Sequence, residues 1–262
     1  MRRCLAYRRR ILDISQQVSA LHAASAFSAA EMVDTIYHGL MRGPDEAAPD
    51  NFIMSKGHGC MIQYAILEDL GILSSADLAS YCKAGGRLGA HPDYGVRGIE
   101  AATGSLGHGA ALAVGMAYAE NRIRRGPGTV YVVVSDGELQ EGSTWEALMM
   151  AANLGVTNLV LMVDHNGFQS FGRTSELHPA FYPIREKAEA FGWEVSEVNG
   201  HDAGAVYEAT ISRKHKRPFM LVGNTVKGRG VAFMENVPLW HYRSPNAEEY
   251  QIALSGLQEV GQ

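Results

Sequence analysis

Short apolar runs rich in β-branched residues alternate along this chain with longer stretches of helical character. Residues 143–154 are one such helical stretch, and Asp202 is placed to cap another. Strands joined through helices pair in parallel, with the helices on both faces, so this alternation predicts a doubly wound, mostly parallel sheet of the α/β class. The strands expected to flank these helices are the β-branched runs 129–134 and 158–163 and the further segments 193–198 and 218–222.

The amino-terminal part is expected to begin with two helices. Residues 4–21 place apolar side chains near helical spacing with arginines on the remaining face, which is typical of an amphipathic helix. Ser28 and Glu31 have the spacing of a capping box and predict the start of a second helix. Gly43 and Pro44 are expected to end that helix, because neither favours its continuation.

A strand, a glycine loop and a third helix are expected next. Residues 52–54 are a short apolar run, and the polar segment 55–59 that follows contains glycines. Residues 61–70 then have helical character until Gly71. Farther along, residues 106–125 predict an apolar helix with many small side chains, which is expected to be buried against neighbouring backbone.

Composition limits the class of protein. With 262 residues and 46% hydrophobic content, residues 1–262 are expected to form one compact domain. The formal net charge of −5 argues against a nucleic-acid partner and favours small-molecule substrates. The apolar runs are too short to span a membrane. Cys4, Cys60 and Cys82 have no C-x-x-C spacing, which suggests neither a zinc site nor a disulfide framework and fits a cytoplasmic protein.

The segments that follow the apolar runs are the candidate ligand site. In parallel sheets, ligands bind beyond the carboxyl ends of the strands. Neither G-x-G-x-x-G after a strand nor G-x-x-x-x-G-K-[ST] occurs, which excludes the commonest nucleotide-binding motifs. A different phosphate ligand is therefore expected. The candidate segments are residues 55–59, 135–141, 164–167 and 224–230.

A carboxylate and an amide follow two neighbouring strands at this edge. Asp136 ends the first run and Asn166 follows the second, so their side chains are expected to lie side by side. Their oxygens suit Mg²⁺, which often takes only one or two protein carboxylates and leaves its other positions to phosphates and water. An Asp-Gly or Asn-Gly dipeptide alone is more often a simple turn, so the prediction depends on the pair.

The segment from Ser135 to Asn166 resembles the thiamine diphosphate signature of the transketolase family. Asn166 follows Asp136 by 30 residues, as in that family. The resemblance implies that Asp136, Asn166 and the main-chain carbonyl of Phe168 bind Mg²⁺, or Ca²⁺ or Mn²⁺ in its place. Gly137 would contact the diphosphate of the cofactor. Ser135 stands where the family usually has glycine, and extended backbone is expected to tolerate it.

Further motifs similar to those of transketolases occur along nearly the whole chain. His22 stands where the family carries the histidine of S-G-H-P-G, although the tail of that motif differs here. The K-G-x-G and W-H motifs are typical of separate amino-terminal transketolase subunits. The matching segments are residues 55–58 (S-x-G-H), 89–92 (G-H-P), 103–109 (T-G-x-L-G), 227–230 (K-G-x-G) and 240–241 (W-H).

The resemblance implies roles for individual residues. His22, His58 and His91 would be catalytic, facing the donor ketose and the reactive carbon C2 of thiamine diphosphate. Imidazoles donate or accept protons near neutral pH, which suits the cleavage of a carbon–carbon bond beside hydroxyl groups. The residues implied to bind the cofactor are Gly104, Leu106, Gly137, Glu141, Asn166 and His241.

Two glutamates have both a structural and a functional explanation. Glu146 follows Ser143 at capping-box spacing, which is a sufficient structural reason for it. In transketolases, glutamates at the places of Glu141 and Glu146 line the dimer interface and help to link the two active sites. Glu141 is the stronger candidate for the interface role.

These resemblances imply an amino-terminal transketolase subunit that transfers a two-carbon ketol unit from a ketose, expected to be phosphorylated, to an aldose. The alternatives are another thiamine diphosphate carboligase, a subunit of a 2-oxoacid-processing enzyme, and a non-catalytic cofactor-binding subunit. Residues 1–262 are expected to hold the diphosphate-binding (PP-type) domain alone. The pyrimidine-binding domain is expected on a carboxy-terminal partner subunit, with two copies of each in a heterotetramer.

Overall fold

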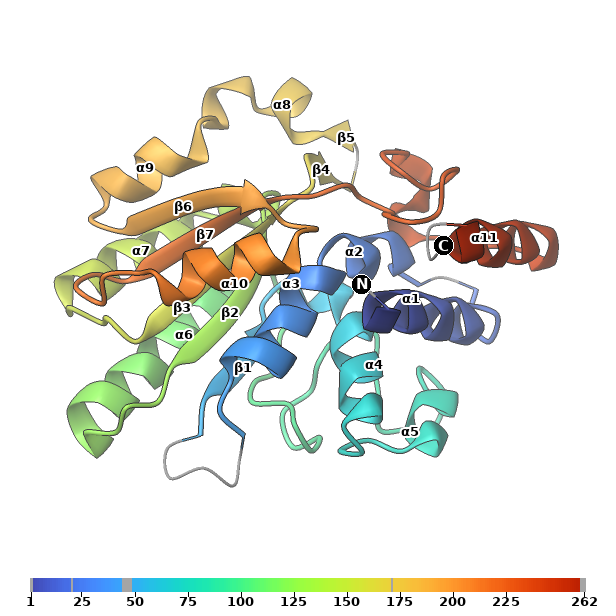
Figure 1. Ribbon diagram of the computed structural model, residues 1–262, viewed down its shortest axis with the longest axis horizontal. Coiled ribbons are helices and arrows are strands. Elements are labelled where there is room, and N and C mark those ends of the chain that lie inside the picture. The colour runs from blue at the N-terminus through green and yellow to red at the C-terminus, as the bar shows by residue number, and fades with distance from the viewer. Residues whose placement is uncertain (1, 20, 44–48, 171, 260–262) are drawn as a thin grey trace.

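Within residues 2–19, 21–43, 49–170 and 172–259, which the computed structural model describes, five parallel strands form one sheet (Figure 1). The strands are β1 (Asn51–Met54), β2 (Val130–Ser135), β3 (Leu159–His165), β6 (Glu194–Asn199) and β7 (Phe219–Asn224). Their order across the sheet is β1-β2-β3-β7-β6, and each neighbouring pair is parallel. The predicted doubly wound α/β fold is therefore confirmed.

Alternate side chains of each strand enter two separate cores. In β2, Tyr131 and Val133 pack with the helices of one face, whereas Val132 and Val134 pack with those of the other. Continuous β-branched runs without polar alternation are typical of a sheet that is covered on both faces. The runs thus account for the layered structure as well as for the strands.

The helices divide between the two faces of the sheet. One face is covered by α6 (His108–Tyr118), α7 (Gly142–Asn153) and α9 (Ile184–Ala190). The other face is covered by α1 (Arg2–Ser15), α2 (Ala23–Ser28), α3 (Ala30–Thr35), α4 (Met61–Asp69) and α10 (Ala203–Ile211). α11 (Ala247–Glu259) packs against α1, which brings the two ends of the described chain together (Figure 1). In the described part of the chain, no helix is long and apolar enough to cross a membrane.

Shorter elements lie in the connections between these helices and strands. They include a β-hairpin, single helical turns and two π-type turns, none of which is evident from periodicity. Their bounds are α5 (Ser75–Ala79), α8 (Thr174–Leu177), β4 (Phe168–Gln169), β5 (Gly172–Arg173), η1 (Ile36–Leu40), η2 (Gly57–Gly59), η3 (Ala119–Arg124), η4 (Glu138–Gln140), η5 (Pro179–Phe181) and η6 (Pro238–Tyr242).

One capping prediction is confirmed and two are wrong. Asp202 caps α10, since its Oδ1 accepts a hydrogen bond at 3.0 Å from a main-chain N–H of the first turn. Ser28 instead lies at the end of α2, where its hydroxyl donates to the buried carboxylate of Asp164, and α3 begins without a side-chain cap. Ser143 donates to the main-chain oxygen of Gly107 at 3.1 Å and does not cap α7. In both cases the serine hydroxyl donates to an acceptor that is distant in the sequence, and the nearby helix begins without a side-chain cap.

The limits of the first helices differ from the prediction. α1 ends at Ser15 and does not reach Leu21. The second predicted helix begins in α3 and continues as the π-type turn η1 to Leu40. Pro44, which was expected to end this helix, lies outside the described residues. Gly71, with a left-handed φ of +69°, follows α4 as expected.

The prediction that residues 106–125 form a helix is confirmed, but the helix is only partly buried. α6 begins at His108 and continues as the π-type turn η3 to Arg124. One side of α6 is buried through Ala113 and Ala117, but Leu112 and Tyr118 are exposed. Apolar or small side chains lie on every side of this helix. Its sequence therefore does not show which side packs against the sheet and which side remains exposed on the surface.

Candidate functional site

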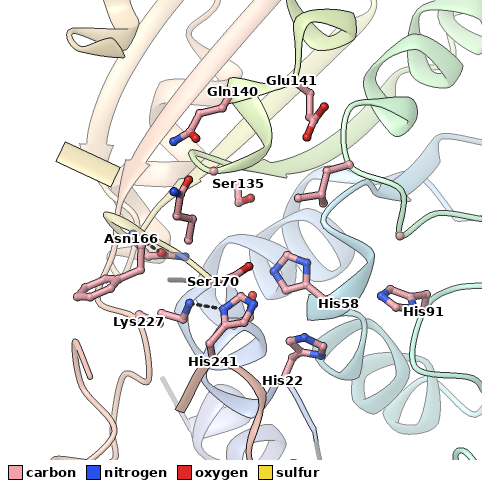
Figure 2. Close-up of a pocket in the computed structure, with 16 residues that line it drawn as sticks. His22, His58, His91, Ser135, Gln140, Glu141, Asn166, Ser170, Lys227 and His241 are labelled. Carbon is pink, nitrogen blue, oxygen red and sulfur yellow. Dashed lines mark hydrogen bonds between the residues drawn. The ribbon is translucent and has the colours of Figure 1, made fainter. Parts of the chain in front are cut away.

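A cavity of about 360 Å³ opens at the carboxyl ends of the parallel strands. Ser135 ends β2, Asn166 follows β3 and Lys227 follows β7, and all three line the cavity (Figure 2). This is the edge at which parallel sheets bind their ligands. The sequence-predicted site residues that line the cavity are His22, His58, His91, Gly104, Leu106, Gly137, Glu141, Asn166, Phe168 and His241.

Asp136, the predicted metal carboxylate, lies behind the cavity wall and is not part of its lining. Gly137 N donates to its Oδ1 at 3.0 Å, and Gly167 N donates to its Oδ2 at 2.9 Å. The hydroxyl of Thr174 also donates to Oδ2, at 3.2 Å. Burial, together with the carboxylate of Asp164, raises the pKa of Asp136 to about 6. A nearby divalent cation would relieve this cost of burying the ionised carboxylate.

Asn166 and Phe168 supply further oxygen atoms on the cavity side of Asp136. Phe168 N donates to Asn166 Oδ1 over 3.0 Å. A Cβ atom on Gly137 would lie 3.3 Å from the Cβ of Gln169 and 3.8 Å from the carbonyl oxygen of Phe168, so glycine keeps this space open. Carboxylate, amide and carbonyl oxygens are the ligands that Mg²⁺ prefers.

Ser135 occupies the family's glycine position without disturbing the strand. It is the last residue of β2, in extended backbone as expected. Its hydroxyl accepts a hydrogen bond from Glu138 N at 3.1 Å. The serine thereby stabilises the turn that leads from β2 to Gln140 and Glu141, which line the cavity.

Four histidines from separate segments lie together on one side of the cavity (Figure 2). The ring centre of His22 lies 5.2 Å from that of His58 and 6.4 Å from that of His91. The ring of His241 is also 5.2 Å from His22. Among the described residues, no group of three His, Cys, Asp or Glu side chains is arranged to hold a metal ion. Ring nitrogens of the four histidines are available to donate or accept hydrogen bonds with a ligand in the cavity.

Burial keeps three of these imidazoles neutral. It is the main reason why the pKa of His22 is lowered to about 4 and that of His241 to about 3. Burial also holds the pKa of His58 well below its ordinary value. At neutral pH each of these rings has one N–H donor and one nitrogen that accepts.

Lys227 received no role from the sequence, although its K-G-x-G motif matched the family. Its side chain is buried, and its Nζ lies 2.6 Å from Nδ1 of His241 (Figure 2). Burial, followed by the charge of Lys56, lowers the pKa of Lys227 to about 8, so it remains charged at neutral pH. The other cavity residues without a predicted role have neutral side chains, and they are Ser25, Ser135, Gln140, Gln169 and Ser170.

The loop that carries Gly104 and Leu106 is held on two sides. Gly104 has a φ of +130°, and a Cβ atom there would lie 2.7 Å from the ring of His91. A side chain at this position would therefore clash. Gly107 N donates at 2.9 Å to the buried carboxylate of Glu138. The glycine thus lets the loop approach His91 closely, and the hydrogen bond to Glu138 anchors the loop on its other side.

The two glutamates singled out from the sequence lie in different surroundings. Glu141 lines the cavity just before α7 begins. Glu146 is exposed on α7 and does not line the cavity. Because Ser143 does not cap α7, the structural explanation for Glu146 is lost.

The combination of these groups defines a class of protein. Oxygen atoms that suit a hard cation lie beside a buried lysine and neutral imidazoles, at the ligand-binding edge of a parallel sheet. A cation and a lysine favour a phosphate group, and neutral imidazoles suit proton exchange with hydroxyl groups. The fold and the site are those of an α/β protein that binds a phosphate-bearing cofactor.

Comparison with known families identifies this cofactor. Residues 2–251 match the family described as "Transketolase, thiamine diphosphate binding domain". The chain belongs to the transketolase family and carries its thiamine-diphosphate-binding domain. The family predicted from the sequence motifs is confirmed.

Relatives of similar length are transketolase subunits. The chain is 35% identical to an apulose-4-phosphate transketolase subunit of Phocaeicola vulgatus, over 96% of this chain and 91% of the relative. It is 33% identical to the 6-deoxy-6-sulfo-D-fructose transketolase subunit SqwG of Clostridium sp., over 92% of this chain and 89% of the relative. The transketolase of Campylobacter jejuni superposes with a TM-score of 0.90 at 26% identity, over 98% of this chain and 42% of that chain. The chain is thus a transketolase-type transferase subunit.

Proposed function

We propose that this chain is the diphosphate- and metal-binding subunit of a two-subunit transketolase, which moves a two-carbon ketol unit from a ketose to an aldose. The observation that carries the proposal is the cavity in which Asn166, Lys227 and the histidines meet. The names of the two relatives include a sugar phosphate and a sulfosugar. A donor ketose with a terminal phosphate or a similar anion is therefore the expected substrate.

The oxygen atoms behind and beside the cavity fit a divalent cation, Mg²⁺ or in its place Ca²⁺ or Mn²⁺. Asp136, Asn166 and the main-chain carbonyl of Phe168 would hold this cation, while the diphosphate supplies further oxygens. The raised pKa of Asp136 supports the assignment, since a cation favours the ionised form of a buried carboxylate. Gly137 leaves room for the diphosphate.

The remaining cavity residues would hold the cofactor. Thiamine diphosphate, when bound, supplies the nucleophilic carbon and the electron sink for cleavage of the ketose. Lys227 and His241 would donate hydrogen bonds to the diphosphate. Gly104 and Leu106 would contact the aminopyrimidine ring, and Glu141 would lie at the junction with the partner subunit.

His22, His58 and His91 would face the donor ketose. Their rings come from three separate segments and lie close together, so they contact one ligand from several sides. The neutral rings of His22 and His58 each offer one donor and one acceptor to sugar hydroxyl and carbonyl groups. We assign these three residues to orienting the sugar and moving its protons.

A carboxy-terminal partner subunit would cover the exposed apolar side of α6 and α7. These helices pack against each other, and Leu112, Met149 and Met150 on them are 44%, 47% and 52% exposed. Exposed apolar side chains gathered on neighbouring elements mark interaction surfaces. The partner would carry the pyrimidine-binding domain, and two copies of each subunit would form a heterotetramer.

The free thiols of Cys4, Cys60 and Cys82 support a cytoplasmic location.

Reconstitution tests this function. The chain is purified alone and with the product of a neighbouring gene, and ketol transfer from ketose phosphates is measured with thiamine diphosphate and Mg²⁺. Activity is expected only for the mixture, together with a mass in solution that corresponds to two copies of each subunit. Asp136→Ala serves as the inactive control. Full activity of the chain alone would contradict the two-subunit proposal.

A further inference from the structure

Another buried carboxylate lies at the carboxyl end of β3 and has no assigned function in the site described above. Asp164 is fully buried and does not line the cavity. Its Oδ1 accepts a hydrogen bond from the hydroxyl of Thr225. Its Oδ2 accepts from the ammonium of Lys56, from the hydroxyl of Ser28 at 2.5 Å and from the amide of Asn166 at 3.1 Å. Four donors from four segments therefore converge on one carboxylate.

Two of these donors connect Asp164 to the wall of the cavity that carries the histidines. Lys56 is fully buried and also donates to the main-chain oxygen of Ser25 at 3.0 Å. His58 follows Lys56 by two residues, and both Ser25 and His58 line the cavity. Ser28 ends the same helix, α2, that contains Ser25.

The other two donors connect Asp164 to the wall that carries the metal-binding residues. Thr225 follows β7 and precedes Lys227, a cavity residue, by two positions. Asn166 itself lines the cavity. Because the carboxylate of Asp164 can only accept hydrogen bonds, the side-chain amide of Asn166 must turn its Nδ2 towards Asp164. Oδ1 of Asn166, the atom suited to a cation, is thereby turned away from Asp164.

We propose that Asp164 is a positioning residue, which holds Asn166 and three other cavity-forming segments in the arrangement that binds the cofactor and its cation. The inference rests on the proposed function, because these segments are the ones assigned to the diphosphate, the metal and the sugar. Asp164 acts through its neighbours and does not touch the cofactor.

The burial of the Lys56–Asp164 ion pair explains why the arrangement is rigid. Both side chains are 0% exposed. A buried charge that loses its partner is strongly destabilising, so displacement of one segment would leave the remaining charges poorly satisfied. Groups that orient a metal ligand typically change metal affinity by about 10- to 100-fold when they are removed.

The test compares Asp164 with a buried carboxylate at the opposite end of the sheet. Asp50 directly precedes β1 and accepts hydrogen bonds from Arg42 N at 2.9 Å and from Thr129 N at 2.6 Å. Asp164→Ala and Asp50→Ala are each purified with the partner subunit. Thermal unfolding gives their stability, and calorimetry gives their affinity for thiamine diphosphate at several Mg²⁺ concentrations.

Both variants are expected to unfold at a lower temperature than the wild type, because each loses the acceptor of several buried donors. Asp164→Ala is expected to lose about 10- to 100-fold in cofactor affinity and to need more Mg²⁺ for half-maximal binding, while Asp50→Ala stays within about twofold of the wild type. Equal cofactor affinities of the two variants would overturn the positioning role. Failure of the wild-type assembly to bind the cofactor would instead overturn the proposed function.

A milder pair of variants decides the question if Asp164→Ala does not fold. Thr225→Val removes one donor to Asp164 and keeps the ion pair with Lys56. Its control is Thr210→Val. The buried hydroxyl of Thr210 donates to the main-chain oxygen of Val206, in the same helix α10, at 2.7 Å and does not line the cavity. A loss of cofactor affinity in Thr225→Val but not in the control is expected, and no difference between them would overturn the proposal.

Discussion

The ammonium of Lys227 lies 2.6 Å from Nδ1 of His241, and this contact determines which nitrogen of the histidine carries the proton. An ammonium group has only donors, so Nδ1 accepts and the proton lies on Nε2. Burial and the charge of Lys227 lower the pKa of His241 to about 3, which keeps the ring neutral. The pair therefore presents a positive charge and an additional N–H donor to a bound anion.

Lys227→Met is expected to weaken the binding of thiamine diphosphate by about 10- to 100-fold, because a hydrogen bond to a charged group contributes roughly 1.5–3 kcal/mol. Calorimetry on the assembled enzyme measures this affinity. Lys214→Met, at an exposed lysine outside the cavity, is the control. Equal affinities of the two variants would argue against a role of Lys227 in cofactor binding.

His58→Ala and His91→Ala are expected to lower kcat/KM by about 100-fold or more while changing cofactor affinity only slightly, because both rings are assigned to the sugar. His241→Ala should show the opposite pattern and mainly weaken cofactor binding. Steady-state kinetics and calorimetry separate these effects. The control is His215→Asn, at an exposed left-handed position that asparagine tolerates. An unchanged kcat/KM for His58→Ala would remove that residue from the mechanism.

Leu112→Glu combined with Met149→Glu is expected to prevent assembly with the partner subunit, because two charges would enter an apolar interface. The isolated variant should keep the circular dichroism spectrum of the wild type, since both side chains are substantially exposed. Ile211→Glu, 45% exposed on α10, is the matched control. Co-purification and mass in solution report the result, and normal assembly of the double variant would exclude this surface as the interface.

Glu31 should make stability depend on pH in the acid range. Burial alone would raise its pKa, but hydrogen bonds from His201 and Arg8 outweigh burial and lower the pKa to about 2. Because this value lies below the ordinary 4.5, the stabilisation is fully present above about pH 4.5 and is lost as the pH falls towards 2.

When the pH is lowered from about 6 to about 3, the protonation of Glu31 in the unfolded chain should reduce the free energy of unfolding by about 2 kcal/mol. Urea denaturation at a series of pH values measures the loss. Glu31→Gln keeps the shape of the side chain and should remove this part of the pH dependence. The same slope in both proteins would show that Glu31 does not control acid stability.

The strands and the edge at which the site lies follow from the amino-acid sequence alone. Each predicted strand agrees with the structure to within a few residues. In β2 and β3 this is because β-branched side chains that enter two cores leave a continuous apolar run, whereas the edge strand β6 alternates polar and apolar residues. Motifs that follow strands in sequence also meet in space, since the carboxyl ends of parallel strands lie at one edge. His58, Asn166 and Gly137 could therefore be assigned to one site without a structure.

The pairing of polar side chains across distant segments, in contrast, emerges only in the folded chain. Ser28 matches a helix cap in its local sequence, yet its hydroxyl donates to Asp164, which lies in a different part of the chain. Lys56 and Lys227 likewise acquire their roles from partners that no spacing rule indicates. Which side of α6 is exposed is likewise decided only by the fold, because a helix that is apolar all round is buried only where another element covers it. Hydrophobic periodicity is a local property, whereas the satisfaction of a buried charge depends on every segment that meets around it.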